Sequence, residues 1–319
     1  MKDKIILGCE KHGEFEVEAQ KFIYRQQGCP KCAIASHVSK PEQELADYIK
    51  SLGVEVIQND RSLIAPQEID ILIPSHNLAI EYNGLYWHTE QQGKDKQYHK
   101  NKTLACKEKG YQLIHIFEDT YKYNKDKILS HLKYRLGKRE TKSIYARKCE
   151  IRKIEVREAN KFLDTYHIQG SVRQAFLHLG LFHNNKLVSV TSFKKGQSNT
   201  KNKGSFELIR HATSGSVVGS LGKAVKYFAK NISPKIFTFC DDSFFSGASY
   251  LNAGFKETSK IEPDYMYVVG DTREHKFKWR LKDIKEKLGI EGMTEREAME
   301  HAEIPRVYDG GKTRYDFII

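Results

Sequence analysis

The part of the chain that decides its fold reads Glu68-Ile-Asp70-Ile-Leu-Ile-Pro-Ser-His-Asn-Leu-Ala-Ile-Glu81-Tyr-Asn83-Gly84-Leu-Tyr-Trp87-His88. Two apolar runs, 68–73 and 78–82, flank a turn with Pro, Ser and Asn, and this pattern predicts a β-hairpin. Acidic residues stand at the ends of both strands, and a histidine follows the second. Carboxylates that leave paired strands can meet at one divalent cation, while a nearby imidazole takes a proton from water. The alternative is a hairpin whose polar side chains simply face solvent.

The residues on both sides of this hairpin predict a compact α/β unit. Pro41 suits the first turn of a helix, and Gly53 suits its end. We expect helices over 41–52, 98–109 and 120–136, and further strands over 54–57 and 111–117. The resulting order α-β-β-β-α-β-α is typical of a mixed sheet covered by helices.

The composition favours a polyanionic partner. The chain has 319 residues, more than one compact domain usually holds, and 53 Lys and Arg against 41 Asp and Glu give it a net charge of +12. Nucleic acid is the first candidate, with membrane surfaces or scattered solvated lysines as alternatives. The sequence contains no apolar run of membrane-spanning length, and its first residues are polar. We therefore expect a cytoplasmic protein without a signal peptide.

A separate metal site is predicted near the N-terminus. Cys9-Glu-Lys-His12 and Cys29-Pro-Lys-Cys32 each place two ligands on a tight turn. Four such ligands suit a tetrahedral structural Zn²⁺ and leave no open position for a substrate. We expect residues 1–37 to form a small zinc-ribbon-like module. Two unrelated pairs of ligand-type residues are the alternative.

A charged connection over 138–148 precedes a second large domain. Strands are expected over 151–154, 177–182, 186–193, 206–212, 236–240 and 266–269. Helices are expected over 156–166, up to Asn231, through Tyr250, and over 280–288 and 294–302. The end of the chain is expected to be a polar tail.

The first large unit resembles a known nuclease family. The features are Glu42 on the leading helix, Asp70, the run Gly84-x-x-Trp87-His88, and Gln112-Leu-Ile-His-Ile-Phe117-Glu118 after a helix. They resemble the very-short-patch repair endonucleases and, more closely, the phage and intron homing endonucleases described by a Glu-Asp-x-His-Asp signature. The resemblance covers about residues 41–136 and implies a restriction-endonuclease-like fold. The zinc module also resembles modules attached to such phage enzymes.

The resemblance implies a role for each polar side chain. Asp70 would bind Mg²⁺, and Glu81 would be a second ligand or only the edge of the hairpin. His88 would take a proton from the attacking water, and Glu42 would hold the other nitrogen of that ring. A helix-cap or surface role for Glu42 stays open, because Glu44 lies two residues further on.

Two positions depart from the family pattern. The last acidic residue of the signature falls at His99 of the second helix. Either His99 contacts the reacting water or the scissile phosphate, or Asp95 takes over the acidic role. Asn83 stands where the wider fold has a lysine, which is consistent with His88 as the base.

DNA contacts are expected beside this site. The expected phosphate and base contacts are Asn83, Lys94, Lys96, Lys100, Lys102 and Trp87. For each lysine, a solvated charged loop is the alternative, and Trp87 either stacks on a base or packs in the core.

The C-terminal part resembles the GNAT acyltransferase fold at two motifs. Gly219-Ser-Leu-Gly222-Lys-Ala224 opens a helix, and Ser249-Tyr250-Leu-Asn-Ala-Gly254-Phe255 is similar to a closing motif of that fold. The resemblance implies an α+β domain whose helix start, at Gly219, Gly222 and Ala224, holds the pyrophosphate of an acyl-CoA-like cofactor. The first motif lacks the Arg or Gln common in that fold.

The sequence thus predicts a multidomain α/β protein. Its parts are a zinc module over 1–37, an endonuclease domain over 38–137 and a GNAT-like domain over 138–319. The first hypothesis is a site-specific, Mg²⁺-dependent homing endonuclease that cuts double-stranded DNA, encoded by a phage and acting inside a bacterial host. The second is a group-transfer protein that modifies DNA and uses the nuclease-like domain for targeting. The third is a non-catalytic DNA-binding regulator, and the oligomeric state stays open.

Overall fold

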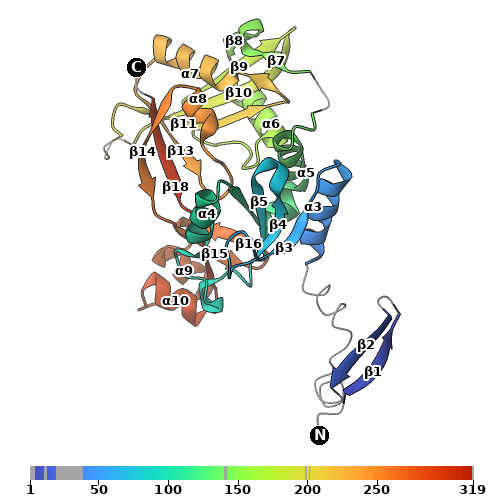
Figure 1. The fold of residues 1–319 in the computed structure, drawn as a ribbon. Helices are drawn as coiled ribbons and strands as arrows, with labels where there is room; N and C mark the ends of the chain where they lie inside the picture. Colours follow the sequence, from blue (N-terminus) through green and yellow to red (C-terminus); the bar gives the residue numbers. More distant parts are fainter. Residues whose placement is uncertain are drawn as a thin grey trace.

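The computed structural model describes residues 4–10, 13–18, 39–139, 142–197, 200 and 202–317 (Figure 1). The protein is a mixed α/β protein with several sheets. At its N-terminus, strands β1 (Lys4–Cys9) and β2 (Gly13–Glu18) pair in antiparallel fashion. No helix in the described part of the chain is long and apolar enough to cross a membrane.

The first large unit follows the predicted order α-β-β-β-α-β-α. Its elements are α3 (Lys40–Ser51), β3 (Ile57–Asp60), β4 (Ile69–Ile73), β5 (Leu78–Asn83), α4 (Tyr98–Glu108), β6 (Gln112–Phe117) and α5 (Glu118–Arg135). The sheet has the order β3-β4-β5-β6, antiparallel except for the parallel pair β5 and β6. The strand predicted over 54–57 is wrong in its bounds. Val54 packs into the core after Gly53 ends the helix, and pairing begins only at Ile57.

Helices cover both faces of this sheet. On one face, Leu45 of α3 and Leu132 of α5 pack against Ile80. On the other face, Cys106 of α4 packs against Ala79 and neighbouring residues. Because side chains alternate along a strand, Glu81 and Asn83 share the face of Ala79. The polar end of β5 therefore lies under α4.

The C-terminal half forms a larger sheet. Its elements are β7 (Ile144–Tyr145), β8 (Glu150–Lys153), α6 (Val156–Tyr166), β9 (Leu177–His183), β10 (Lys186–Lys195), β11 (Phe206–Thr213), β12 (Val217–Val218), α7 (Ser220–Asn231), β13 (Ile236–Asp241), α8 (Ala248–Asn252), β14 (Phe255–Ile261) and β18 (Lys312–Phe317). Seven strands pair in the order β14-β18-β13-β11-β10-β9-β8. β11 and β13 pair in parallel over only two residues and then separate.

The predicted polar tail is wrong. Residues 312–317 form β18, which lies between β13 and β14 and pairs with both. Thr313 and Tyr315 are buried, while their neighbours in sequence are more exposed. The alternation that marks a strand was hidden because the inward position 313 is a threonine and half of the segment is charged.

The chain between β14 and β18, residues 262–311, forms a small body that we call the insert. It contains β15 (Tyr265–Val269), β16 (Thr272–His275), α9 (Leu281–Leu288), α10 (Glu295–His301) and β17 (Arg306–Tyr308), with the sheet order β16-β15-β17. Although it belongs to the C-terminal half in sequence, the insert lies beside the first large unit, near α4 (Figure 1). Val268 and Val307 pack there against Leu85 and Phe117.

A second segment also joins the two halves. The loop after β13 places Phe244 in the core formed by α3, α5 and their sheet. The backbone amide of His115 in β6 donates to the carbonyl of Ser243 at 2.7 Å. The two halves are therefore packed together and not joined only by a linker.

Candidate active site

Two acidic side chains face each other where β4 and β5 pair. The register that pairs Ile71 with Ile80 brings Asp70 next to Glu81. A carboxylate oxygen of Glu81 accepts from the Asp70 amide at 3.3 Å, and a carboxylate oxygen of Asp70 accepts from the Tyr82 amide at 2.7 Å. Each acid is thus fixed by the backbone of the opposite strand.

A lysine from α4 completes this pair. The ammonium of Lys102 lies 2.7 Å from Glu81 Oε2, and only 5 % of Lys102 is exposed. The prediction that Lys102 is a surface phosphate contact is therefore wrong, because it points inward over the sheet. The nearby carboxylates raise the pKa of Lys102, so it stays charged at neutral pH.

A third acid, Glu42, stands in the first turn of α3. Ser39 caps this helix by accepting from the Glu42 amide at 3.3 Å. The Glu42 side chain is buried, and its Oε1 has no hydrogen-bond partner among the described residues. Glu44 instead pairs with Lys125 at 2.5 Å on the outer side of the helix. Of the two acids considered from the sequence, Glu42 is therefore the buried one and Glu44 the one at the surface.

Burial raises the pKa of all three acids, and the charge of Asp70 adds to this effect for the other two. Burial, followed by repulsion from Asp70, raises the pKa of Glu42 to about 7. Burial and the charge of Asp70 also raise the pKa of Glu81, and Lys102 partly opposes this. Burial raises the pKa of Asp70 as well. Acidic groups held in this way gain stability when a cation joins them.

Three histidines form a second cluster beside the acids. His88 Nδ1 lies 3.1 Å from His99 Nε2, and the two rings are stacked. His99 packs edge-on against His115, whose Nδ1 and Nε2 lie 3.2 and 2.9 Å from the side chains of Asn83 and Thr103. His99 is only 1 % exposed, so it does not reach a substrate as proposed from the sequence. It holds His88 instead.

The prediction that Glu42 orients His88 is not what the structure shows. The nearest charged neighbour of Glu42 is Asp70, and His99 occupies the second ring nitrogen of His88. Burial, together with Lys94 and Lys102, lowers the pKa of His88 to about 3. His88 is therefore neutral at physiological pH, but it is a weaker proton acceptor than a free histidine.

Four other predicted DNA contacts differ in their exposure. Asn83 is fully buried against His115, so its prediction as a DNA contact is wrong. Trp87 is 68 % exposed and stands next to Tyr86, which excludes the core role for Trp87. Lys100 pairs with Glu262 of the insert at 2.6 Å. Lys96 is exposed.

Two residues flank the start of α4 at the edge of the site. The ammonium of Lys94 lies over the ring of Tyr98 at 4.2 Å. Asp95 accepts from the Gln97 amide at 3.0 Å just before this helix, so it acts in a turn and not in the site.

The acids fit a hard divalent cation better than a soft one. Within the described residues, no three His, Cys, Asp or Glu side chains already surround one metal position. Mg²⁺ commonly binds through only one or two carboxylates and keeps several waters. Asp70 with Glu81 or Glu42 supplies such a set, and the unpartnered Oε1 of Glu42 is suited to bind a water.

The predicted zinc site lies mostly outside the described residues. Cys9 ends β1, whereas His12, Cys29 and Cys32 are not described. Zn²⁺ therefore remains a prediction from the spacing of these four residues.

The proposed cofactor motif lies at the start of α7. Gly219 is the N-cap residue, with a left-handed φ of 79°, and Ala224 is buried in the core. The ammonium of Lys223 donates to the carbonyls of Ala146 and Cys149, so the chain itself packs along this helix start. Gly222 lies 3.8 Å from Ala253, measured from an added Cβ, and also faces protein. An acyl-CoA-like cofactor at this helix start remains a prediction.

Comparison with known proteins gives two findings. Residues 1–33 match the family model described as "Protein of unknown function (DUF723)". This match covers the predicted zinc module and not the site described above. No curated protein has a sequence that matches the chain.

The C-terminal half resembles a solved acetyltransferase structure. A Bacillus subtilis acetyltransferase in complex with CoA shares 14 % identity, and the match covers 54 % of this chain and 99 % of that one. The TM-score is 0.31, which is too low to carry an argument about activity.

Proposed function

We propose that the chain is a metal-dependent endonuclease that hydrolyses phosphodiester bonds in double-stranded DNA. The observation that carries this proposal is the convergence of Glu42, Asp70 and Glu81 with the buried Lys102 at one end of a sheet. A buried group of acids with a single lysine is costly for stability, and such groups occur mainly at functional sites. The homing type of target selection remains part of this proposal.

Asp70 and Glu81 would hold Mg²⁺, which when bound stabilises the negative charge that develops on the scissile phosphate. Lys102 keeps a fixed positive charge beside Glu81 and favours the same developing charge. Glu42, with a pKa near 7, is better matched than His88 to accept a proton from the attacking water. His88 then serves to position water or phosphate while it is held by His99.

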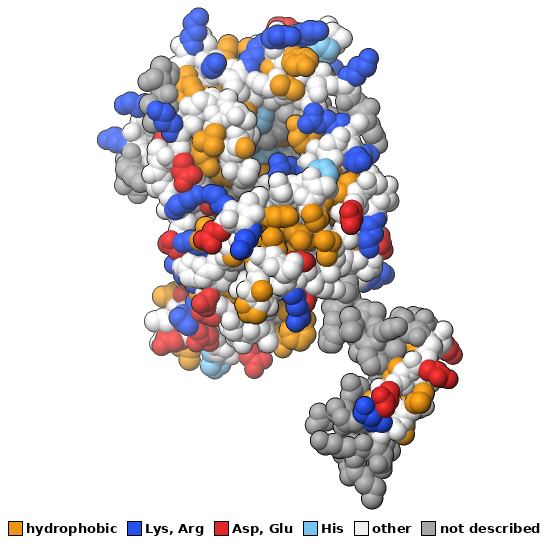
Figure 2. Space-filling model, viewed as in Figure 1, with side chains coloured by type: hydrophobic (Ala, Val, Ile, Leu, Met, Phe, Trp, Pro, Cys, Tyr) orange, Lys and Arg blue, Asp and Glu red, His pale blue; other side chains and the backbone are white. Residues whose placement is uncertain are grey.

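The surface beside the site is consistent with a nucleic acid. Tyr86 and Trp87 are 60 % and 68 % exposed and follow β5 directly, so their rings are available to stack on bases. On the face shown in Figure 2, Lys and Arg side chains are spread over the upper part, which is the C-terminal half around α7, whereas Asp and Glu gather in the lower part. The net charge of +12 also favours binding to nucleic acid.

A cleavage assay tests this proposal. Purified full-length protein is incubated with phage or bacterial genomic DNA and Mg²⁺, and the ends are mapped by sequencing. Asp70→Asn and Lys102→Met should each lower cleavage by at least about a hundredfold, while DNA binding persists. Glu55→Gln, an exposed acid in the same unit, is the matched control and should cut normally. Full activity of Asp70→Asn, or binding without any cleavage by the wild type, contradicts the proposal.

Group transfer by the C-terminal half is the second candidate. The observation that favours it is the short parallel pairing of β11 with β13, over only two residues, in the half of the chain where Arg210 and Tyr250 interact. Figure 2 shows a hollow in the upper half with His and Lys or Arg side chains along it. Titration of the full chain with acetyl-CoA, followed by calorimetry, tests this candidate. Saturable binding favours it, and a flat titration removes its support.

A further inference from the structure

The loop that carries His88 is held by residues far away in sequence. This loop, residues 84–97, connects β5 with α4, and we call it the His88 loop. Five backbone hydrogen bonds lie within the loop: His88 N to Gly84 O, Thr89 N to Tyr86 O, Gln92 N and Lys94 N to Thr89 O, and Gly93 N to Glu90 O. They close short turns, and the Leu85 amide, which donates to the Glu118 carboxylate at 2.8 Å, holds the start of the loop to α5. The Glu90 side chain needs partners from elsewhere.

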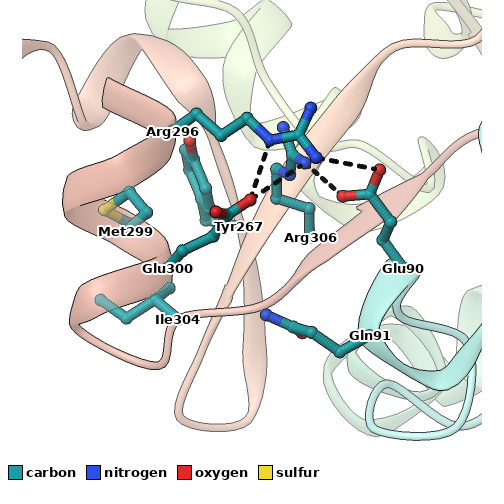
Figure 3. Close-up of a pocket in the computed structure, with 8 residues that line it drawn as sticks. All are labelled: Glu90, Gln91, Tyr267, Arg296, Met299, Glu300, Ile304 and Arg306. Atoms are coloured by element: carbon teal, nitrogen blue, oxygen red, sulfur yellow. Dashed lines mark hydrogen bonds and ion pairs between the residues drawn. The ribbon is translucent and has the colours of Figure 1, made fainter. Parts of the chain in front are cut away.

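The insert supplies that attachment. Arg306 of β17 forms an ion pair with the Glu90 carboxylate, and the Arg306 side chain is 9 % exposed. The Tyr308 hydroxyl donates to Glu90 Oε1 at 3.4 Å. Figure 3 shows Arg306 and Arg296 between Glu90 on one side and Glu300 of α10 on the other. A pocket of about 290 Å³ lies beside these residues.

The two arginines differ in how well they can fix the loop. Arg296 is 62 % exposed and lies 3.9 Å from Glu90, and its main partner is Glu300 at 2.8 Å. Arg306 is buried and holds Glu90 directly, with Glu300 only as a second partner at 3.8 Å. The Glu90 side chain is 32 % exposed, so its pair with Arg306 is partly shielded from solvent, whereas the exposed Arg296 contributes less.

β16, the other outer strand of the insert, contacts residues that pack against the histidine cluster. Arg273 of β16 pairs with Asp119 at 3.0 Å and donates to the Thr120 hydroxyl at 2.8 Å. Its guanidinium lies over the ring of Phe117 at 3.8 Å, and this ring contacts His99. Each outer strand of this small sheet therefore carries an arginine that contacts residues around His88 and His99.

We propose that Arg306 is a positioning residue of the nuclease site, which acts through Glu90 to hold the His88 loop in place. The inference rests on the proposed function for its effect on cleavage, but not for its effect on the loop. A buried ion pair is weak support for overall stability, and its better-attested use is to fix one arrangement among several. On this proposal, the insert serves the nuclease site by holding the His88 loop, although it follows β14 in sequence.

The test compares Arg306→Gln, Arg306→Lys, Glu90→Gln and the double variant Glu90→Gln/Arg306→Gln in the full-length protein. Lys285→Gln is the matched control, because it removes an exposed ion pair, to Glu291, in the same insert. Hydrogen exchange of residues 84–97 and Mg²⁺-dependent cleavage under single-turnover conditions are measured for each.

Arg306→Gln should speed exchange in the His88 loop and lower the single-turnover rate about tenfold or more, with DNA affinity changed less than twofold. Arg306→Lys should recover part of the rate, and the double variant should be no slower than Arg306→Gln, because both changes remove one interaction. A rate loss that follows global unfolding, or additive losses, overturns the proposal. If the wild type does not cut at all, the proposed function fails, and unchanged exchange in Arg306→Gln still overturns the positioning role.

Discussion

The ammonium of Lys102 lies 2.7 Å from the carboxylate of Glu81, and both side chains are almost fully buried. Lys102 comes from α4, one element later than β5, which carries Glu81 and Asn83. It therefore supplies from a helix the positive charge that Asn83 does not supply from the strand. This relationship joins α4 to the sheet at the proposed site.

Removal of Lys102 should affect stability as well as activity. Lys102→Met leaves Glu81 buried without its partner, and such a change costs about 3–5 kcal/mol. Urea unfolding of Lys102→Met should show this loss, whereas Glu81→Gln/Lys102→Met should regain much of it and still not cleave DNA. Recovery of cleavage by the double variant would contradict the role of the pair.

Replacement of Trp87 should weaken DNA binding without affecting the fold. A base stacked on an aromatic ring contributes about 1–3 kcal/mol, so Trp87→Ala should weaken binding by roughly five- to a hundredfold. Fluorescence anisotropy with a short duplex measures this, and thermal unfolding checks the fold. Tyr145→Ala, another exposed aromatic but in the C-terminal half, is the control and should bind normally.

Phe244 should couple the unfolding of the two halves. It is buried in the core of the first large unit, whereas its neighbour Phe245 is 38 % exposed. Phe244→Ala should cost about 3–5 kcal/mol, and Phe245→Ala much less. Calorimetry should show one transition for the wild type and a separation into two for Phe244→Ala. A single unshifted transition in Phe244→Ala would show that the contact is dispensable.

Acid should destabilise the fold through histidines that are kept neutral. Burial lowers the pKa of His211 from 6.5 to about 4, and that of His131 likewise. The folded state binds fewer protons than the unfolded chain between these values, so this stability is complete above pH 6.5 and is lost as the pH falls toward 4. The pKa of His211 is about 2.5 units below its ordinary value. At about 1.4 kcal/mol per pKa unit, the free energy of unfolding falls by roughly 3 kcal/mol at most.

Urea unfolding at pH 7.5, 6.0 and 5.0 measures this slope. His211→Gln should make the free energy of unfolding depend less on pH, because the group that takes up the proton is gone. His301→Gln, an exposed histidine on α10, should leave the slope unchanged. An equal slope in all three proteins would exclude His211 as a contributor.

Much of the first large unit could be predicted from its sequence. Its order of elements follows from apolar periodicity and from local stop signals such as Gly53 and Gly110. The proximity of Asp70 and Glu81 also follows, because a short hairpin leaves little freedom of register. These are local relationships, and sequence patterns record them well.

Contacts between distant segments could not be predicted in the same way. The inward direction of Lys102 depends on how α4 sits over β5, and a lysine among other lysines looks like a surface residue. The pair of Glu90 with Arg306 joins positions 216 residues apart, and no periodicity marks either one. The lowered pKa of His88 depends on burial, with packing against α4, and on Lys94 and Lys102, and its sequence neighbours do not indicate that burial.

The place of β18 between β13 and β14 has a consequence for incomplete chains. The strand that closes the seven-stranded sheet follows the insert in sequence, so the sheet is completed only after the insert has been made. A polypeptide that stops before Lys312 leaves neighbouring strands with unpaired backbone groups, which favour aggregation. The fold thereby disfavours the accumulation of a fragment that contains the proposed site but lacks the residues that hold its loop in place.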